Sequence, residues 1–378
     1  MTNSTPLAVV LLGLAIAGCS RDREAAGVPG WRLVEDLRIG GADSGVASFN
    51  DVRGLAVTPA GGILVLDFQS QEIRLFDSTG RFVKLVARKG QGPGELANAN
   101  GMVTGPDGAL TVNDPRNGRF SVYDQDGTFV RQHTVPGWGY GYRWVGGVDT
   151  AGRLYEEFYV RNDTVPYVRR FSPDFSRTDT LRRPICATEL ERSSYVWMMK
   201  DKGREIAHGV MGVPYAPTRV GLLDARGHVW CARSDRDDIV EFDLASRDSV
   251  GVIHGRRSAV PISRAQHDSA VASVKAFARQ MGDLDPDLTR IGADLPVIRN
   301  LTTDDHGRLW VLAGTADTVS VYDLYAPDGR ELATVSANFL GASDPEWHPV
   351  IRGDRFYTLT TDADGVPSVI RARLVRTR

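Results

Sequence analysis

Arginine recurs at one position of an internal repeat. Arg53, Arg219 and Arg299 each lie eight residues before a glycine whose neighbours mark a turn. The same register and its chain neighbours hold four further candidates, Asn100, Arg143, Trp144 and Asn300. A guanidinium fork matches the geometry of a carboxylate or a phosphate. If these side chains converge, the sequence predicts an anion-binding site.

The alternative is structural. These residues would then be strand-end side chains that extend into solvent or pair with acids such as Asp51. Arginine is common on protein surfaces, so one sequence leaves both interpretations open. The elements that carry the register therefore decide how the residues meet.

The stretch Gly101–Arg131 shows those elements in their simplest form. A short apolar run is followed by the turn residues Pro106-Asp107-Gly108, and an alternating strand over Phe120–Tyr123 is followed by Asp124-Gln125-Asp126-Gly127. Such turns favour tight antiparallel connections. Four antiparallel strands joined in this way form one propeller blade.

The same unit recurs along the chain. Its turn glycines are each followed two residues later by an apolar strand residue: Gly61, Gly108, Gly152, Gly227 and Gly307. A weaker sixth copy covers Gly353–Leu374. Where nothing is inserted, the copies lie about 44–47 residues apart, and a repeat of this length is typical of propellers. We therefore expect an all-β, six-bladed β-propeller with four-stranded antiparallel blades, and we expect Trp31–Ile39 to complete the last blade and close the ring.

Two motifs resemble a known superfamily. Lys89–Leu96 (KGQGPGEL) is similar to a connector of NHL-type propellers, and Ile73–Asp77 (IRLFD) fits their third strand. The chain thus resembles the six-bladed NHL/TolB-like superfamily over residues 31–376. The resemblance implies the fold, and it implies no single activity, because that superfamily includes binding modules, scaffolds and enzymes.

The N-terminus has the features of an export signal. An apolar run over Leu7–Ile16 is too short for an ordinary membrane span and precedes Ala17-Gly18-Cys19. This resembles a bacterial lipobox and implies a signal peptide over 1–18, lipidation of Cys19 and a flexible tether over 19–30, with the propeller at 31–378. An ordinary secretory signal is the alternative. With Ser20 after Cys19, the resemblance implies the outer membrane in a Gram-negative cell, facing the periplasm or the cell surface.

Two insertions interrupt the repeat, at about 183–214 and 254–296. Thr188–Lys202 suggests partly helical structure with aromatic and Met side chains, either a small cap on the rim or a lid over a ligand. In the second insertion, Ser263 and Gln266 form a capping box, and Ala270, Val274, Phe277 and Met281 share a helical face. We expect an amphipathic helix of about five turns docked on its own domain.

Other chemistry is weakly indicated. Cys186 and Cys231 are a possible disulfide outside the cytoplasm, with two isolated thiols as the alternative. The seven histidines form no HxH or HExxH pair, so no dedicated metal site is predicted. The net charge of −2 argues against a nucleic-acid partner.

We therefore expect a lipid-anchored binding protein in the cell envelope. The sequence favours a protein that is not an enzyme over one that is. Its ligand would be a protein, a peptide, a glycan or an anionic molecule at the central channel. The alternative is a propeller enzyme. One form resembles calcium-dependent lactonases, with Asp51, Asn100 and Asn300 as potential calcium ligands. The other is lyase-like, with Tyr140, Tyr142 or His348 as base.

Overall fold

The computed structural model describes residues 30–41, 44–135, 143–144, 146–158, 166–184, 193–201, 204–283, 285–314, 319–338 and 347–377. The signal segment, Cys19 and the tether up to residue 29 lie outside these residues, as do Tyr140, Tyr142 and Cys186. Within the described part, no helix has both the length and the apolar character needed to cross a membrane.

The first three blades are regular four-stranded antiparallel sheets, numbered from the ring centre outward. Their strands are β2 (Val52–Val57), β3 (Ile63–Asp67), β4 (Glu72–Phe76) and β5 (Phe82–Ala87); β6 (Gly101–Thr104), β7 (Leu110–Asp114), β8 (Arg119–Tyr123) and β9 (Phe129–Thr134); and β10 (Gly146–Val148), β11 (Leu154–Phe158), β12 (Tyr167–Phe171) and β13 (Thr178–Arg182).

The last three blades complete the ring. Their strands are β16 (Arg219–Leu223), β17 (His228–Arg233), β18 (Asp238–Asp243) and β19 (Ser249–His254); β22 (Ile298–Thr303), β23 (Leu309–Ala313), β24 (Ser320–Tyr325) and β25 (Glu331–Ala337); and β26 (Val350–Arg352), β27 (Arg355–Thr361), β28 (Pro367–Arg376) and β1 (Gly30–Gly40). Short 3-10 helices are η1 (Gly45–Ala47), η2 (Pro115–Asn117) and η3 (Leu288–Arg290).

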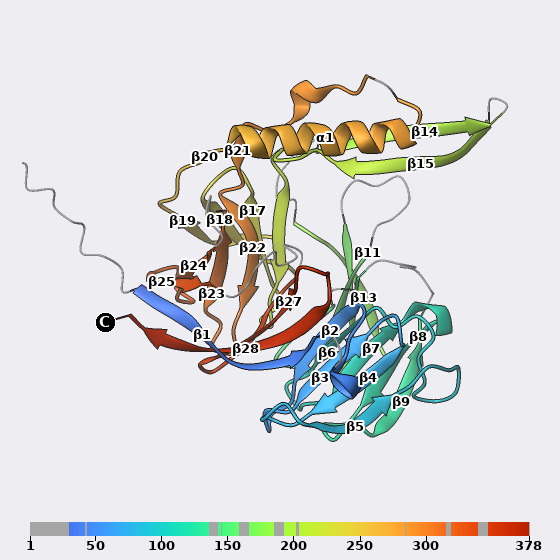
Figure 1. The fold of residues 1–378 in the computed structure, drawn as a ribbon. Coiled ribbons are helices and arrows are strands. Elements are labelled where there is room, and N and C mark those ends of the chain that lie inside the picture. The colour runs from blue at the N-terminus through green and yellow to red at the C-terminus, as the bar shows by residue number, and fades with distance from the viewer. Residues whose placement is uncertain are drawn as a thin grey trace, which may run out of the picture.

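The expected closure by the N-terminal strand is confirmed. β1 is the outermost strand of blade 6, where it pairs antiparallel with β28 from Trp31 to Gly40, and its first three residues also run parallel to the later part of β25, the outer strand of blade 5. Figure 1 shows β1 and β28 side by side although they lie at opposite ends of the chain. Asp36 of β1 accepts hydrogen bonds from Arg355 and Arg371. Closure therefore combines a backbone ladder with an ion-pair cluster.

The hydrophobic core is divided among the blade interfaces. Separate clusters of buried side chains fill each gap between neighbouring blades, for example Leu66, Met102 and Leu110 between blades 1 and 2. Because each blade is covered on both faces, its inner strands can bury side chains on both faces rather than on alternate residues. All five residues of β3 are buried.

The two faces of the ring differ. Every innermost strand begins at one face, which we call the insertion face, and ends at a tight turn on the other, the turn face. The predicted turn glycines lie on the turn face and have φ between 72° and 83°, which favours glycine. Both insertions lead into the start of an innermost strand, β16 and β22, so both belong to the insertion face.

An Asp–aromatic pair stabilises three of the turns on the turn face. Asp304 accepts hydrogen bonds from the backbone N–H groups of His306 and Arg308 with one oxygen, and from Arg308 Nε and Trp310 Nε1 with the other. Asp149 with Tyr155, and Asp224 with Trp230, repeat this arrangement. The spacing D-x-x-G-x-x-[Y/W] is visible in the sequence and is a structural signal.

Acids at similar places on the third strands have different roles. Asp77 and Asp124 accept backbone N–H groups of their own turns. Asp323 instead lies inside β24 and binds the guanidinium of Arg257. Arg257 belongs to the second insertion, so this pair ties that insertion to blade 5.

Candidate functional site

Two arginines of the register lie where the pairing of an innermost strand is irregular. The pairing of β2 with β3 shifts between Val52 and Gly54, and that of β22 with β23 shifts between Ile298 and Asn300. Arg53 and Arg299 are therefore the extra residues of two equivalent β-bulges. A bulge redirects the side chain of its extra residue and is common beside binding sites. The sequence alignment found the register but not the bulges.

Arg53 is turned toward its own blade. Its Nε and Nη2 lie 3.0 and 2.9 Å from an oxygen of Asp51, and its guanidinium carbon lies 3.5 Å from the centre of the Phe68 ring. Asp67 holds the connector in front of β2 by accepting the N–H groups of Asn50 and Asp51. The alternative of pairing with Asp51 is thus observed for Arg53, and contact of Arg53 with a ligand stays a prediction.

Arg299 and Arg219 lack such an acid. Arg299 is half-buried and Arg219 is exposed, and neither forms an ion pair with a described residue. Arg219 begins β16 directly opposite Arg233, which is itself bound to Asp235. Burial raises the pKa of the Tyr322 hydroxyl, and the positive charge of Arg299 opposes that rise.

Arg143 meets the opposite side of the ring. Its guanidinium carbon lies 4.9 Å from the centre of the Trp347 ring, a cation–π distance. Arg143 precedes blade 3 and Trp347 precedes blade 6, so this contact links two blades that face each other in a six-bladed ring. Asn300 of blade 5 joins them, since its Nδ2 donates to the carbonyl oxygen of Trp347 at 3.2 Å.

Asn100 and Trp144 join blades 2 and 3 at the same level. The N–H of Trp144 donates to the carbonyl of Asn100, and the Asn100 side chain accepts from Asn113 Nδ2 at 3.0 Å. The Trp144 ring lies 5.5 Å from the ring of Phe120. Asn100 is fully buried, which makes it a supporting residue at this level.

Buried donors gather at the insertion face. The indole Nε1 atoms of Trp144 and Trp347 are shielded from solvent and have no acceptor among the described residues. Asn98 Nδ2, in the connector that leads to β6, is a third donor of this kind. An unsatisfied buried donor costs about 1–3 kcal/mol. Such groups are commonly satisfied by a water, an ion or a ligand.

Trp347 was missed by the sequence analysis. The sixth repeat is a weak copy, so the sequence does not extend the arginine register to it. The structure explains this divergence, since β26 has three residues and is followed at once by the tight turn at Gly353 and Asp354. His348 hydrogen-bonds to the carbonyl of Leu301, and Arg352 donates to Thr104 of blade 2.

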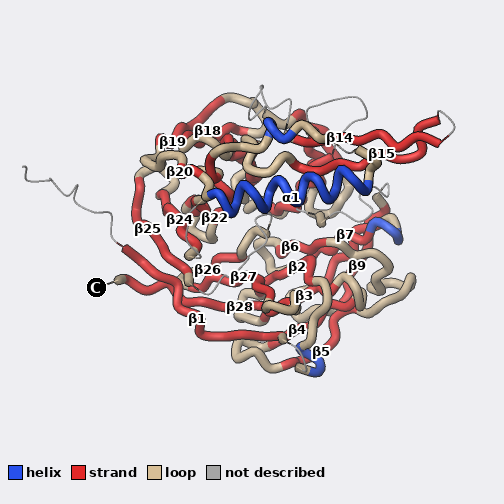
Figure 2. Tube along the Cα trace, turned by 45° about the horizontal axis from the view of Figure 1, so that its top comes forward, coloured by secondary structure: helices blue, strands red, loops and turns tan. Residues whose placement is uncertain are grey.

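A cap covers part of the insertion face. It consists of the hairpin β14 (Ser194–Asp201) and β15 (Arg204–Gly212), the helix α1 (Arg264–Gln280), and the short pair β20 (Val260–Pro261) and β21 (Asp294–Leu295). Figures 1 and 2 show α1 lying across one face of the ring, with the hairpin beside it. Each insertion supplies one half of the cap.

The helix agrees with the expectation. Ser263 and Gln266 form both hydrogen bonds of the capping box, and Ala270 and Val274 lie on the buried face. Its docking partner was unforeseen. The ring of Phe277 lies 5.3 Å from that of Trp197 on the hairpin, so one insertion packs on the other.

The helical character expected within Thr188–Lys202 is wrong over its second half. Residues 194–201 form a strand, in which the buried Tyr195 and half-buried Trp197 alternate with the exposed Val196 and Met198. A period of two is the strand pattern. Pairing with β15 and packing under α1 favour it over the helix.

Polar contacts lock the two halves together. Trp197 Nε1 donates to Asp283 at 2.8 Å, and the Tyr195 hydroxyl donates to the carbonyl of Asp287 at 2.6 Å. Arg290 covers the Tyr195 ring at 4.4 Å and donates to the carbonyl of Ser194. The bond from Trp197 is the main cause that lowers the pKa of Asp283.

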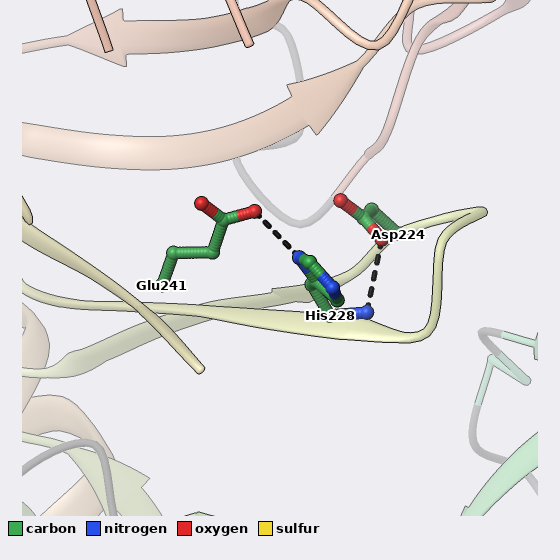
Figure 3. Close-up of side chains that lie close together, drawn as sticks. All are labelled: Asp224, His228 and Glu241. Atoms are coloured by element: carbon green, nitrogen blue, oxygen red, sulfur yellow. Dashed lines mark hydrogen bonds and ion pairs between the residues drawn. The ribbon is translucent and has the colours of Figure 1, made fainter. Parts of the chain in front are cut away.

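Two groups of acidic and histidine side chains on the turn face have their potential ligand atoms close enough together for a metal ion. Figure 3 shows Asp224, His228 and Glu241 close together. Arg226 already binds both Asp224 and Glu241, at 2.7 and 2.5 Å, and Trp230 donates to Asp224. A calcium ion would have to displace these donors, so this cluster does not fit calcium.

The second cluster consists of Asp304, Asp305 and His306. Its carboxylates also accept hydrogen bonds from donors of the protein. Asp304 holds its own turn through four hydrogen bonds, and Asp305 accepts the N–H of Gly353. Both clusters lie on the face opposite the cap. They are therefore structural networks of the turn face.

Cys231 is buried in β17 and is disulfide-bonded. The other two cysteines of the chain, Cys19 and Cys186, lie outside the described residues. The pairing of Cys186 with Cys231 therefore stays a prediction.

Comparisons with known proteins agree with the fold. A family model described as a 6-bladed beta-propeller, DUF5128, matches residues 50–140. No curated protein matches. A Bacteroides fragilis protein proposed to be exported is 12% identical, with 92% of this chain and 96% of its own covered and a TM-score of 0.48.

Two further solved structures have the same degree of similarity. A member of the DUF4221 family from Bacteroides vulgatus is 9% identical, with 93% and 100% of the two chains covered and a TM-score of 0.46. A catalytically inactive virginiamycin B lyase from Staphylococcus aureus, with quinupristin, is 10% identical, with 91% and 100% covered and a TM-score of 0.45. Similarity at this level carries over no site residue. Membership of the NHL/TolB-like superfamily stays a prediction.

Proposed function

We propose that this chain is a lipid-anchored binding protein of the cell envelope, which holds its ligand at the insertion face beneath the cap. The observation that carries the proposal is the position of the two insertions. Both lead into innermost strands at the face where the candidate residues lie, and they pack on each other through Trp197 and Phe277. A cap built from two insertions on one face is typical of a ligand site on a rigid scaffold.

The residues at that face support a binding role. Arg143, Trp347 and Asn300 belong to three different blades, and Trp347 contacts each of the other two. The indole donors of Trp144 and Trp347 add two hydrogen-bonding groups that a ligand would satisfy. Asn300 lies in β22, while Arg143 and Trp347 lie in the connectors before β10 and β26 and are held by contacts between blades. Contacts of this kind position side chains before a ligand binds, which lowers the entropic cost of binding.

The turn face offers no comparable arrangement in the part of the chain described. Its charged groups are bonded to each other, as Asp224 is to Arg226. This contrast supports ligand binding at the insertion face, where Asp51, one of the predicted calcium ligands, is paired with Arg53. Membrane attachment rests on the sequence before residue 30.

A binding screen tests the proposed function. The full chain in detergent would be scanned for thermal stabilisation by organic acids, neutral sugars and short peptides, and proteins that co-purify from solubilised membranes would be identified. Each ligand found would then be located by amide exchange. Protection at the insertion face and in the cap supports the proposal, and protection confined to the turn face contradicts it.

Anchoring is tested separately. We expect the wild-type chain, expressed in a Gram-negative host, to incorporate an alkyne-tagged fatty acid and to sediment with membranes. Cys19→Ser should lose both properties. Labelling that persists in Cys19→Ser would show that the lipid attachment is placed incorrectly, and a soluble, unlabelled wild type would favour the ordinary secretory signal.

A further inference from the structure

We infer that the insertion face binds one small oxyanion, held by the guanidinium of Arg299 and by the indole N–H of Trp347, with Arg143 and Arg219 supplying further positive charge. This inference rests on the proposed function and names its ligand class. The oxyanion is a carboxylate or a phosphate group of a small ligand, since both groups accept hydrogen bonds from a planar guanidinium fork.

Arg299 is the first support. It is the extra residue of a β-bulge, which turns its side chain out of the regular ladder. It is half-buried, and it forms no ion pair with the described residues. Arg53 provides the comparison, because it occupies the equivalent bulge and is held by Asp51 and Phe68. The same backbone device therefore presents one neutralised arginine and one that an anion would neutralise.

Trp347 is the second, independent support. It is more than nine-tenths buried, and its Nε1 has no acceptor in the described part of the chain. Its carbonyl is bonded to Asn300, the residue next to Arg299. Its ring lies under the guanidinium of Arg143. One acceptor group placed beside this ring would satisfy the buried indole and would lie close to the guanidinium of Arg143.

The charges around this site favour an anion. Arg143, Arg219 and Arg299 precede or begin the innermost strands of the adjacent blades 3, 4 and 5. Three acids of the insertion face and its cap are already bound: Asp51 to Arg53, Asp235 to Arg233, and Asp283 to Trp197. The two insertions that form the cap lead into blades 4 and 5, so the cap belongs to the same sector. Removing water from this sector would strengthen the attraction.

Only some of the predicted ligand residues would face the anion. Arg299, Trp347, Arg143 and Arg219 are retained as groups that face the anion. Asn100 and Asn300 become positioning residues, because their side chains bond to Asn113 and to the carbonyl of Trp347. Arg53 is outside the site, which makes it a matched control.

Isothermal titration calorimetry of the full chain in detergent, at low ionic strength and pH 7, tests the inference. The probes are D-glucuronate, inorganic phosphate and, as the neutral control, D-glucose. We expect one of the two anions to bind at a single site and glucose not to bind. Arg299→Gln should weaken the anion by about 10-fold or more, Trp347→Phe by about 5-fold, and Arg53→Gln by less than about 2-fold.

Each outcome of the titrations either supports or overturns the oxyanion site. Glucuronate alone assigns the site to carboxylates, phosphate alone assigns it to phosphates, and either supports the inference. Binding of neither anion overturns it, as does an equal effect of Arg299→Gln and Arg53→Gln. If Arg299→Gln does not fold, Arg299→Lys replaces it, keeping the charge while losing the fork, and should still weaken binding. If neither anion binds while another ligand protects the insertion face from amide exchange, the oxyanion fails and the proposed function stands.

Discussion

The guanidinium of Arg143 lies over the indole ring of Trp347, at 4.9 Å from the ring centre. The two residues precede blades that face each other across the ring, and each adjoins or contacts a residue of the arginine register, Trp144 on one side and Asn300 on the other. A six-fold scaffold thus brings together residues far apart in the chain. The contact lies at the face that carries the cap, which is why we place ligand binding there.

Ring closure should depend on one buried residue of β1. Leu33→Ala removes a side chain that is 3% exposed within the cluster between blades 5 and 6, and should cost about 2–5 kcal/mol of unfolding free energy. Val34→Ala, next to it and 36% exposed, should cost about 0.5 kcal/mol or less. Urea unfolding measures both. Equal effects would show that β1 does not stabilise the ring through this cluster.

Asp304 should contribute strongly to the stability of the protein through the turn that it holds. Asp304→Asn weakens four hydrogen bonds to a fully buried carboxylate and should cost about 1–3 kcal/mol. Asp328→Asn is the control, since Asp328 is exposed and accepts one backbone N–H. Thermal unfolding of the two variants provides the test. A smaller shift for Asp304→Asn than for Asp328→Asn would contradict the structural role of this motif.

The joint between the two insertions should respond to acid. Trp197 holds the pKa of Asp283 below its ordinary value, so the contact favours the ionised carboxylate. Its stabilisation is complete above the ordinary aspartate pKa of about 3.9 and is lost as the pH falls through the lowered pKa.

Amide exchange of α1 measures this joint. At pH 6 the helix should exchange more slowly in the wild type than in Asp283→Asn, and the difference should shrink as the pH falls through the lowered pKa of Asp283. Exchange in β3, far from the cap, serves as the internal control. A difference that grows as the pH falls would contradict the assignment of the joint.

Calcium should have little effect on the chain. Asp224 and Glu241 are bound by Arg226, so millimolar calcium should raise the thermal midpoint by about 1 °C or less, and a chelator should not lower it. Magnesium at equal concentration controls for ionic strength. A large stabilisation specific to calcium would return weight to the lactonase-like alternative.

Much of the fold could be predicted because it depends on local signals. The turn glycines, the strand over Phe120–Tyr123 and the capping box of Ser263 and Gln266 are set by neighbours in the sequence, and each is present in the structure. The strand is buried on both faces, so its predicted alternation does not mark an exposed face. Closure by β1 followed from the count of strands. The hairpin at 194–212 was missed because its strand form depends on packing under α1, a contact between two separate insertions.

The candidate site was predictable only in part. The register of Arg53 and Arg299 is visible in the repeat, but the bulges that redirect these side chains are not. Trp347 could not be aligned, because the innermost strand that follows it is short, and its contacts with Arg143 and Asn300 join different blades. Sequence spacing can place residues on one face, and only the closed ring shows which of them meet.

The central claim is that the capped insertion face holds the ligand. Amide exchange of the full chain, with and without a saturating ligand found by the binding screen, tests it most directly. The account predicts slower exchange at the starts of β6, β22 and β26 and in α1, with no change at the turns around Gly108, Gly227 and Gly307. Slower exchange at those turns, with the insertion face unchanged, would contradict it.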